Sequence, residues 1–368
     1  MKMDTIKLIE RLSNAFGPSG FEDDVMTAAS AYAKDFAILQ ESSIRNLYVR
    51  PKTTGRKKVG RPPKSDKPVL MIDAHSDEIG FMVHSIMPNG MIKIHPLGGW
   101  APTTLPSSTV IVKNADGEPV RGIITSVLRH FKAEPERGKP LEISDMMLDI
   151  GAHSAEQAAK EYKIRIGAPI VPDVRFNYDS KTGVMMGKAF DDRLGCACVL
   201  ETLRYISYEY DSLGVSLVGT LTSQEEVGLR GAIVAANEVK PDIAIFFEGT
   251  PADDYFEPPH MIQTALRKGP MLRHIDDRMI TNPRFLRFAL DIAQEKNISV
   301  QEAVRKGGAT NAGAVHISGQ GVPCIVIGVP VRYIHTHHSL AVTEDYTKAV
   351  ELAVEIVRKL DFEIIAKF

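Results

Sequence analysis

Five short apolar runs, each ending abruptly in polar residues, constrain the fold of this chain more than any other feature. The runs are PVLMIDAHSDE (68–78), TGVMMGKAFDDRLG (182–195), VSLVGTLTSQEE (215–226), DIAIFFEGTPADD (242–254) and PCIVIGVPVRYIHTHH (323–338). Most are preceded or followed by helix-like segments, at 193–208, 228–238, 284–306 and 343–361. Near-continuous apolar strands that alternate with helices are typical of a parallel sheet covered on both faces. We therefore predict an α/β fold with a mainly parallel sheet sandwiched by helices.

The region from about residue 85 to 180 has a different pattern. It contains short β-like segments separated by glycine, proline and turn signals: MIKIHPLGGW, STVIVKNADGEPVRGIITSV and RIGAPIVP. A chain of 368 residues is also long for a single hydrophobic core. We predict a small β-rich domain at 81–180, inserted into a catalytic α/β domain formed by residues 1–80 and 181–368.

Composition excludes several classes of protein. Charged residues make up 24% of the chain and the formal net charge is −2, so there is no general attraction for nucleic acid or anionic membranes. No apolar run approaches the roughly 20 residues of a membrane span. The N-terminus, MKMDTIKLIERLSNAFG, has helical spacing and lacks the apolar segment of a signal peptide, which predicts a cytoplasmic protein. With only three cysteines, we expect buried free thiols and no disulfide framework.

One basic stretch stands apart from this composition. PKTTGRKKVGRPPKSDKP, residues 51–68, contains the segment GRPPK, which is similar to the Gly-Arg-Pro hooks that enter the minor groove of A·T-rich DNA. No aromatic residue is interleaved, and the overall charge gives no support. A solvated loop between two strands is therefore our interpretation, with DNA contact as the alternative.

Carboxylate and imidazole side chains gather at the polar ends of the five runs. In an open parallel sheet, ligands bind outside the carboxyl ends of the strands. The candidates are His75 and Asp77, Asp191 and Asp192, Glu225 and Glu226, Glu248, and His335, His337 and His338. Each alone has an ordinary explanation, such as a surface turn, a helix N-cap or a solvated loop. Together they form a donor set that suits Zn²⁺, Co²⁺ or Mn²⁺ in a hydrolytic site.

A two-metal hydrolase is the mechanism that this donor set favours. Two cations about 3.5–4 Å apart need one bridging carboxylate and a balanced set of terminal ligands. We assign the bridge to Asp191, since its place before a helix leaves both oxygens free. His75 and Glu248 would complete one site, and Glu226 and His335 would complete the other.

Two further carboxylates have no place among these ligands. Asp77, two residues after His75, is placed to accept the far ring N–H of a ligating histidine and so to fix its tautomer. Glu225 is left without a metal role, and a non-ligand carboxylate beside the attacking water is what a hydrolase needs as its general base. We therefore predict catalytic roles for Asp77 and Glu225.

With these residues the chain resembles a known family, the TET-type dinuclear-metal aminopeptidases. This family also contains glutamyl aminopeptidases and cellulase-M-like metallopeptidases. The matching segments occur in the family's order and span most of the chain. They are AHSDEIGFMV (74–83), LGGW (97–100), LP (105–106), LDIGA (148–152), GKAFDDRLGC (187–196), TSQEEVGLRGA (222–232) and VPVRYIHT (329–336).

The resemblance implies a metal-dependent aminopeptidase that removes N-terminal residues from short peptides, with a fold like that of dinuclear zinc exopeptidases. It implies two divalent ions per subunit and a dimerisation role for the inserted domain. It also implies dimers that assemble into a hollow dodecamer, which admits peptides and excludes folded proteins. The base it implies is Glu225, and the implied ligands are His75, Asp191, Glu226, Glu248 and His335.

The chain departs from the family pattern at three places in or near this set. Glu248 stands where aspartate is usual, Asn311 stands where many relatives have aspartate, and His335 is accompanied by His337 and His338. The long basic stretch described above is a further departure. The departures leave the donor chemistry of every ligand position intact.

Other functions remain as alternatives at this stage. The same metals could serve an N-acyl amino acid or peptide deacylase. A glycosidase would leave the metal ligands unexplained, and a non-catalytic binding or assembly protein would not need them. The N-terminal residue preference stays open: Asp253 and Asp254 would favour basic residues if they face the substrate, while solvated loop carboxylates are the simpler interpretation.

Overall fold

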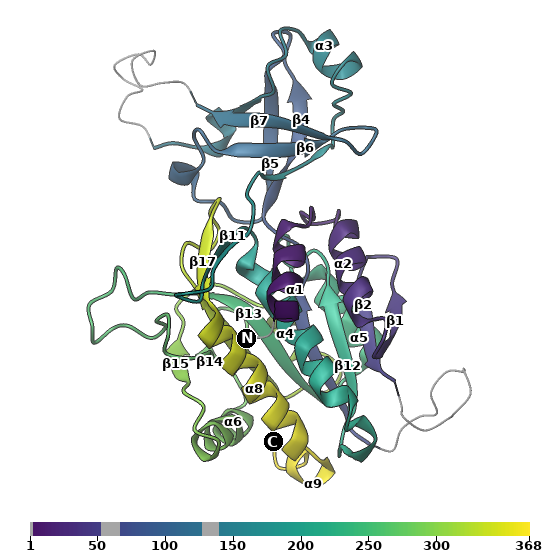
Figure 1. The fold of residues 1–368 in the computed structure, drawn as a ribbon, viewed down its shortest axis with the longest axis vertical. Helices are drawn as coiled ribbons and strands as arrows, with labels where there is room; N and C mark the ends of the chain where they lie inside the picture. Colours follow the sequence, from purple (N-terminus) through teal and green to yellow (C-terminus); the bar gives the residue numbers. More distant parts are fainter. Residues whose placement is uncertain (1–2, 53–66, 127–139) are drawn as a thin grey trace.

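The computed structural model describes residues 3–52, 67–126 and 140–368, which form two lobes (Figure 1). The larger lobe contains an eight-stranded sheet with the strand order β1-β2-β12-β3-β13-β16-β14-β15. Its strands are Ala37–Glu41 (β1), Leu47–Pro51 (β2), Val69–His75 (β3), Ser216–Thr222 (β12), Ile243–Pro251 (β13), Met271–Ile275 (β14), Gln301–Val304 (β15) and Cys324–Val331 (β16).

The sheet is mixed, with a parallel centre. Strands β12, β3, β13 and β16 run parallel to one another, as the apolar runs predict. Antiparallel pairing joins β1 to β2, β2 to β12, and β16 to β14. The prediction of a mainly parallel sheet is therefore right for the central strands, while the outer strands make the sheet as a whole mixed.

Helices cover both faces of this sheet. One face packs on α1 (Met3–Asn14), α2 (Asp23–Ala33), α4 (Phe190–Ser207), α6 (Pro283–Glu295) and α8 (Thr343–Lys359). The other packs on α5 (Arg230–Val239) and α7 (Ala312–Val315). Successive strand residues point to opposite faces, so Leu70 and Ile72 join the first core while Met71 joins the second. This two-sided burial explains why the strands read as continuous apolar runs.

Two predicted elements differ from the observed ones. The helix predicted at 284–306 ends at Glu295, and β15 follows it, because the chain leaves helical geometry at Asn297, whose φ is +56°. The apolar run at 182–195 contributes β11 (Val184–Gly187), which lies outside the main sheet. It forms a three-stranded sheet with β10 (Asn177–Asp179) and β17 (Ser339–Val342).

The smaller lobe is a closed barrel with the strand order β4-β5-β8-β7-β6-β9. Its strands are Gly80–Ile86 (β4), Ile92–Leu97 (β5), Thr109–Lys113 (β6), Pro119–Thr125 (β7), Met147–Asp149 (β8) and Pro169–Pro172 (β9), with the helix α3 (Ala155–Lys160) beside them. It has its own core, in which Phe81 and Trp100 stack with ring centroids 4.8 Å apart. Strand β4 begins five residues after His75, so the barrel is joined directly to the end of a central strand.

A buried cationic cluster anchors the N-terminal segment to the centre of the larger lobe. The guanidinium of Arg193 donates to the carbonyls of Ser76, Leu12 and Gly17 at 2.6–3.0 Å, and it lies 3.2 Å from a Glu78 carboxylate oxygen. Lys188 donates to the other oxygen of Glu78 at 2.7 Å. Arg193, Glu78 and Lys188 are all buried. The turn after β3, the start of α4 and the end of α1 are thereby held together.

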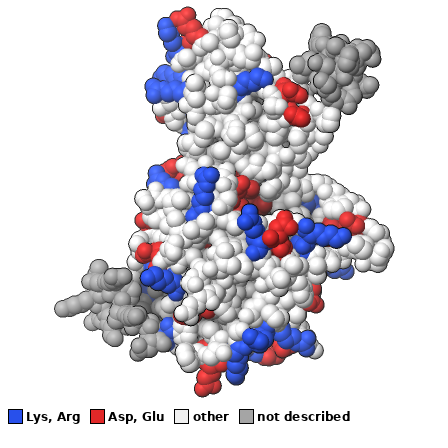
Figure 2. Space-filling model, turned by 180° about the vertical axis from the view of Figure 1, so that it is seen from behind, with Lys and Arg blue, Asp and Glu red and all other residues white. Residues whose placement is uncertain are grey.

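Surface features agree with the composition. The face in Figure 2 shows basic and acidic side chains interspersed among the described residues, without an extended patch of one sign. Within the described ranges, no helix is long and apolar enough to cross a membrane. Of the basic stretch 51–68, residues 53–66 lie outside the described residues.

We expect Arg193→Leu to lower the free energy of unfolding by about 3–5 kcal/mol. The buried Glu78 carboxylate would keep only Lys188 as its partner, and several carbonyls would lose their donor. Urea unfolding measures this loss. Arg121→Leu is the matched control, because Arg121 is 74% exposed and pairs with Asp173, so its loss should stay below about 1 kcal/mol. Equal losses in the two variants would contradict the anchoring role of Arg193.

Candidate metal centre

The predicted ligands come from five separate elements. His75 is the last residue of β3, and Asp191 lies in the first turn of α4. Glu226 follows β12, and His335 follows β16. Glu248 lies within β13, three residues before the strand ends, so the prediction of a strand-end position is wrong for this residue.

The fold brings these five side chains into two groups that share one residue. His75, Asp191 and Glu248 form one group, and Asp191, Glu226 and His335 form the other. In each group, the potential ligand atoms lie within 4.8 Å of one another. The two oxygens of Asp191 face different imidazoles, with His75 Nε2 at 2.9 Å from one and His335 Nε2 at 3.2 Å from the other. A carboxylate that serves two sites needs this arrangement.

The far nitrogen of each histidine faces an oxygen atom. Nδ1 of His75 lies at an ion-pair distance of 3.4 Å from Asp77 Oδ1, without a hydrogen bond among the described residues, and Nδ1 of His335 lies 2.7 Å from the carbonyl oxygen of Gly99. Acceptors of this kind fix the tautomer of a ligating histidine and turn its other nitrogen toward the metal. Asp77 lies where its predicted role requires an acceptor.

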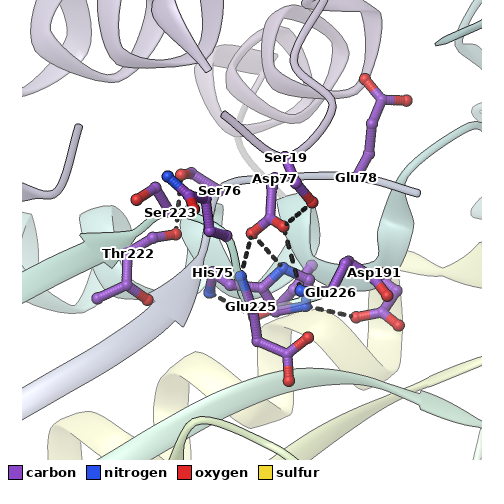
Figure 3. A network of polar contacts seen from close by, with 12 residues as sticks. Ser19, His75, Ser76, Asp77, Glu78, Asp191, Thr222, Ser223, Glu225 and Glu226 are labelled. Carbon is purple, nitrogen blue, oxygen red and sulfur yellow. Dashed lines mark hydrogen bonds and ion pairs between the residues drawn. The ribbon is translucent and has the colours of Figure 1, made fainter. Parts of the chain in front are cut away.

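Asp77 makes additional contacts that the sequence did not indicate (Figure 3). Its Oδ1 accepts from the backbone N–H of Glu225 at 2.9 Å, and its Oδ2 accepts from the N–H of Glu226 at 3.1 Å. The hydroxyl of Ser19 donates to Oδ2 at 2.6 Å. In Figure 3 the Glu225 side chain points away from Asp77, while its amide points toward it. One buried carboxylate therefore orients a histidine and both adjacent glutamates.

The protonation of the centre is governed by burial and by the concentration of carboxylates. Burial raises the pKa of Glu225 to about 7, and Asp77 and Asp191 act in the same direction. Burial also raises the pKa values of Glu226 and Glu248 well above their ordinary range, with repulsion from Asp191 adding to the effect. The adjacent glutamates are therefore costly to ionise together unless positive charge is nearby.

The residues present fit divalent cations. Glu226 has a buried carboxylate oxygen that accepts no hydrogen bond from the described residues. Burial opposes protonation of His335, but Glu226 and Asp191 outweigh it and raise its pKa to about 10. The raised pKa of His335 indicates that negative charge is in excess around its imidazole. Oxygen and imidazole donors around such an excess suit Zn²⁺, Co²⁺ or Mn²⁺.

Asp192 has a structural role, although it adjoins the shared ligand. Its Oδ1 accepts from the backbone N–H groups of Gly195 and Gly249, at 2.9 and 3.0 Å, and its Oδ2 accepts from the N–H of His75 at 3.2 Å. The bond to Gly195 caps the regular part of α4, which begins after the non-helical residues Asp191 and Asp192. The peptide bond between Asp191 and Asp192 is cis. Asp192 thus binds backbone N–H groups, while Asp191 is left free for the ligand role predicted for it.

The remaining departures from the family pattern lie outside the two donor groups. Asn311 donates its amide to Asp73 and to Thr222, at 2.7 Å each, in a buried network behind the ligands. An amide suits this place because it donates to the buried Asp73 carboxylate. His337 lies 2.6 Å from the carbonyl oxygen of Thr109 in the barrel, and His338 contacts His337.

Two residues beside the centre were not indicated by the sequence, and two others were indicated only as part of a matching segment. Ser19 and Glu22 belong to the segment after α1, which the apolar runs gave no reason to place here. Gly98 and Gly99 belong to the segment LGGW, in which two adjacent glycines are a signal for a close approach of the backbone. A Cβ on Gly98 would lie 2.6 Å from Ile79 and 3.0 Å from Glu226, and φ at Gly98 is +82°. Only glycine lets this loop approach the ligands so closely.

A cavity of about 810 Å³ opens onto the centre. Its lining includes Asp191, Glu225, Glu226, Glu248 and His335, so all the ligands except His75 reach its wall. The volume falls in the usual range for small-molecule sites. A short peptide end can therefore be accommodated beside the metal ligands.

The buried carboxyl of Glu22 provides a test of how burial and nearby carboxylates raise pKa values beside the centre. One of its oxygens accepts from the N–H groups of Gly20 and Gln224, and the other has no partner among the described residues. Burial raises the pKa of Glu22 from 4.5 to about 7, with Asp77 adding repulsion. A carboxyl whose folded-state pKa is raised loses stabilising free energy as the pH rises from its unfolded to its folded pKa.

We therefore expect Glu22→Gln to match the parent in stability near pH 4.5 in metal-free protein. At pH 8 the variant should be more stable by about 1–3 kcal/mol, since the amide keeps the accepting oxygen and removes the charge. Urea unfolding at both pH values gives the two differences. A variant no more stable at pH 8 than at pH 4.5, relative to the parent, would contradict the assignment.

Comparison with known proteins gives a consistent result. Residues 58–352 match the model of the M42 glutamyl aminopeptidase family. The glutamyl aminopeptidase of Lactococcus lactis is 31% identical over 99% of each chain. The lysyl aminopeptidase of Pyrococcus furiosus is 29% identical, over 81% of this chain and 83% of its own.

Solved structures are similar over the full length. A TET aminopeptidase from a marine sediment thaumarchaeon superposes with a TM-score of 0.92 and 35% identity, covering 99% of each chain. The TET1 peptidase of Pyrococcus horikoshii superposes with a TM-score of 0.83 and 25% identity, covering 97% of this chain and 100% of its own. That peptidase is described as assembling into a tetrahedron or a large octahedral shell.

Proposed function

Because the chain belongs to the M42 glutamyl aminopeptidase family, and so is an aminopeptidase, we propose how its own residues perform the reaction. The observation that carries the proposal is the pair of donor groups that share Asp191, with Glu225 beside them. Relatives of this kind remove N-terminal residues from peptides, and the 810 Å³ cavity suits short peptide ends.

Five residues would hold two divalent cations, Zn²⁺ or Co²⁺ or else Mn²⁺. His75 and Glu248 would serve one ion, Glu226 and His335 the other, and Asp191 both. When bound, the ions would supply Lewis acidity to the scissile carbonyl and to the attacking water. Asp77 and the Gly99 carbonyl would keep the two imidazoles oriented.

Glu225 would act as the general base. Its carboxylate belongs to neither of the two donor groups that share Asp191, although it also lies near His75 and Glu226 in a third possible group. Its pKa of about 7 suits proton transfer near neutral pH. It would take a proton from the attacking water and pass it to the leaving amine of the peptide. Asp77, by binding the Glu225 amide, sets where that carboxylate can reach.

The other functions are less well supported. A deacylase would use the same centre, but the relatives of known activity are aminopeptidases. A glycosidase would not need the five ligands. Comparing the rates on free and N-acetylated peptides separates the first two functions, and we expect hydrolysis of the free peptides only.

Substitution of the two adjacent glutamates should affect different properties, the turnover for Glu225 and the metal content for Glu226. Glu225→Gln is expected to lower kcat by about 10²- to 10⁴-fold while the protein keeps its full metal content, since a base is lost and the ligands remain. Glu226→Gln is expected to lower the metal content, measured by mass spectrometry of the ions after dialysis. Chelation should abolish activity in the parent, and Zn²⁺ or Co²⁺ should restore it.

Parental turnover in Glu225→Gln would refute its assignment as the base. Full metal content in Glu226→Gln would refute its assignment as a ligand. Glu302→Gln is a matched control for both measurements, because Glu302 is exposed and pairs with His274 away from the ligands.

We also propose that the region 81–180 mediates dimerisation and that the dimers assemble into a dodecamer. The support is the likeness to TET structures that form large shells. Light scattering should then give about twelve times the mass of one chain, and a monomer mass would contradict the proposal. The proposed location is the cytoplasm, where free thiols persist, since the three cysteines are unpaired and buried.

A further inference from the structure

One loop of the barrel reaches the metal centre of the other lobe. Strand β5 ends at Leu97, and the three residues that follow form the Gly98–Trp100 loop, which extends to the proposed ligands. Figure 1 shows the barrel as a lobe of its own, next to the larger lobe that carries all five of these ligands. A segment of one lobe therefore contributes to a site built in the other.

The Gly98–Trp100 loop contacts two of the proposed ligands. The carbonyl oxygen of Gly99 lies 2.7 Å from Nδ1 of His335. Gly98 lies against Glu226, since a Cβ at Gly98 would be 3.0 Å from a carboxylate oxygen of Glu226 and 3.2 Å from its Cβ. His335 and Glu226 belong to the same donor group, which Asp191 completes. The loop is thus placed to affect this group in particular.

The other donor group is positioned by elements of the larger lobe. His75 ends β3, where its Nδ1 faces Asp77 and its backbone N–H donates to Asp192 at 3.2 Å. Glu248 lies within β13, in register with Gly328 of the neighbouring strand β16. The strands of the main sheet therefore set the positions of His75 and Glu248, whereas a barrel loop supports His335 and Glu226.

Trp100 binds the loop to the start of β4. Its indole Nε1 donates to the carbonyl oxygen of Gly80 at 2.9 Å, and its ring stacks on Phe81 with an interplanar angle of 16°. Trp100 and Phe81 are both buried. Gly80 is itself closely packed, since a Cβ there would lie 2.5 Å from the carbonyl oxygen of Ile170 in β9. The indole therefore binds to a part of the barrel that has little room to move.

The two glycines make this anchor necessary. Gly98 has a φ of +82°, and adjacent glycines give a backbone little conformational preference of its own. The position of the Gly99 carbonyl therefore depends on the residue that follows it, Trp100. Because Gly80 lies only five residues after His75, the indole also ties this loop to the segment that carries the other ligand histidine.

We propose that Trp100 is a positioning residue for one of the two metal sites, the site of Glu226 and His335. It would hold the backbone of the loop so that the Gly99 carbonyl orients His335 and Gly98 packs against Glu226. The proposal rests on the aminopeptidase function and the metal centre proposed above. Loss of a group that orients a ligating histidine typically costs about 10- to 100-fold in metal affinity.

The fluorescence of the parent gives a first test. Trp100 is the only tryptophan in the sequence, so its emission reports on this loop without any substitution. Metal-free protein is titrated with Zn²⁺, which has no redox chemistry, and calorimetry counts the ions bound. Two ions should bind per subunit, and the emission should change in one of the two steps. In His335→Gln that step should be absent. Constant emission of the parent through both steps would contradict the proposal.

Substitution of Trp100 gives the second test. Trp100→Leu removes both the hydrogen bond and the stacked ring, so it should weaken one Zn²⁺ site about 10- to 100-fold and leave the other unchanged. Equilibrium dialysis against buffered free Zn²⁺, with mass spectrometry of the ions, measures both affinities. Trp100→Phe keeps a ring that can stack on Phe81 and should lose less. With Zn²⁺ in excess, Trp100→Leu should recover the parental kcat, since the residue acts only through the loop.

Leu148→Ala is the matched control for damage to the barrel as such. Leu148 is buried in the same core and pairs with Ile92 at the start of β5, whereas the Gly98–Trp100 loop follows the opposite end of that strand. The substitution leaves a cavity in the core and should lower the Tm, while both Zn²⁺ sites keep their parental affinity. If Trp100→Leu does not fold, Trp100→Phe and the fluorescence of the parent still decide the question.

Four results of the substitutions would overturn the proposal. They are parental affinity at both sites in Trp100→Leu, equal weakening of both sites, a selective loss of the same size in Leu148→Ala, and a low kcat when both sites are full. The last of these would assign Trp100 to the substrate. A parent that binds no Zn²⁺, or that hydrolyses peptides after chelation, would instead contradict the metal centre itself.

Discussion

The buried carboxylate of Asp77 accepts hydrogen bonds from Ser19 and from the backbone of both Glu225 and Glu226, and it faces the far nitrogen of His75. The relative positions of His75 and Glu226, the proposed ligands, and of Glu225, the proposed base, all depend on this single group. Four such contacts need a charged acceptor with two oxygens. A neutral side chain of the same shape would satisfy fewer of them, which explains why a buried charge is tolerated here.

A second buried cluster of charged residues, next to the Asp77 contacts, stabilises the same end of the sheet. Glu78, one residue beyond Asp77, binds Lys188 and Arg193 at the start of α4, and Arg193 binds the end of α1. The proposed ligands on β3 and α4 are thereby fixed to one another by residues outside the two donor groups. The barrel begins at Gly80, two residues after Glu78, so the same cluster stabilises both the start of the barrel and the proposed ligands.

The cavity combines two kinds of charge that have separate tasks. Carboxylates and imidazoles gather where cations fit, and guanidinium groups gather beyond the end of β13. Adjacent acidic residues such as Glu225 and Glu226 raise each other's pKa unless cations compensate them. The cavity therefore presents carboxylates and imidazoles on one side and guanidinium groups on the other.

Much of this protein was predictable from the sequence. Apolar runs that ended in His75, Glu226 and His335 predicted the parallel centre of the sheet and the meeting of the ligands at one edge, because hydrophobic burial on two faces leaves a local pattern. The mixed pairing of the outer strands and the end of α6 at Glu295 were not predictable in this way, since they depend on neighbours and on a single backbone angle.

The sequence by itself determined which donors exist and where along the chain they stand. Only the tertiary structure decided what each one contacts: that Asp192 binds backbone N–H groups while Asp191 faces two histidines, and that Ser19 and Gly99 complete the centre. It also decided that Asp253 pairs with Arg305 and Asp254 with Arg332. Hydrogen bonds and ion pairs between distant segments depend on distance and direction in space, and no local pattern records these.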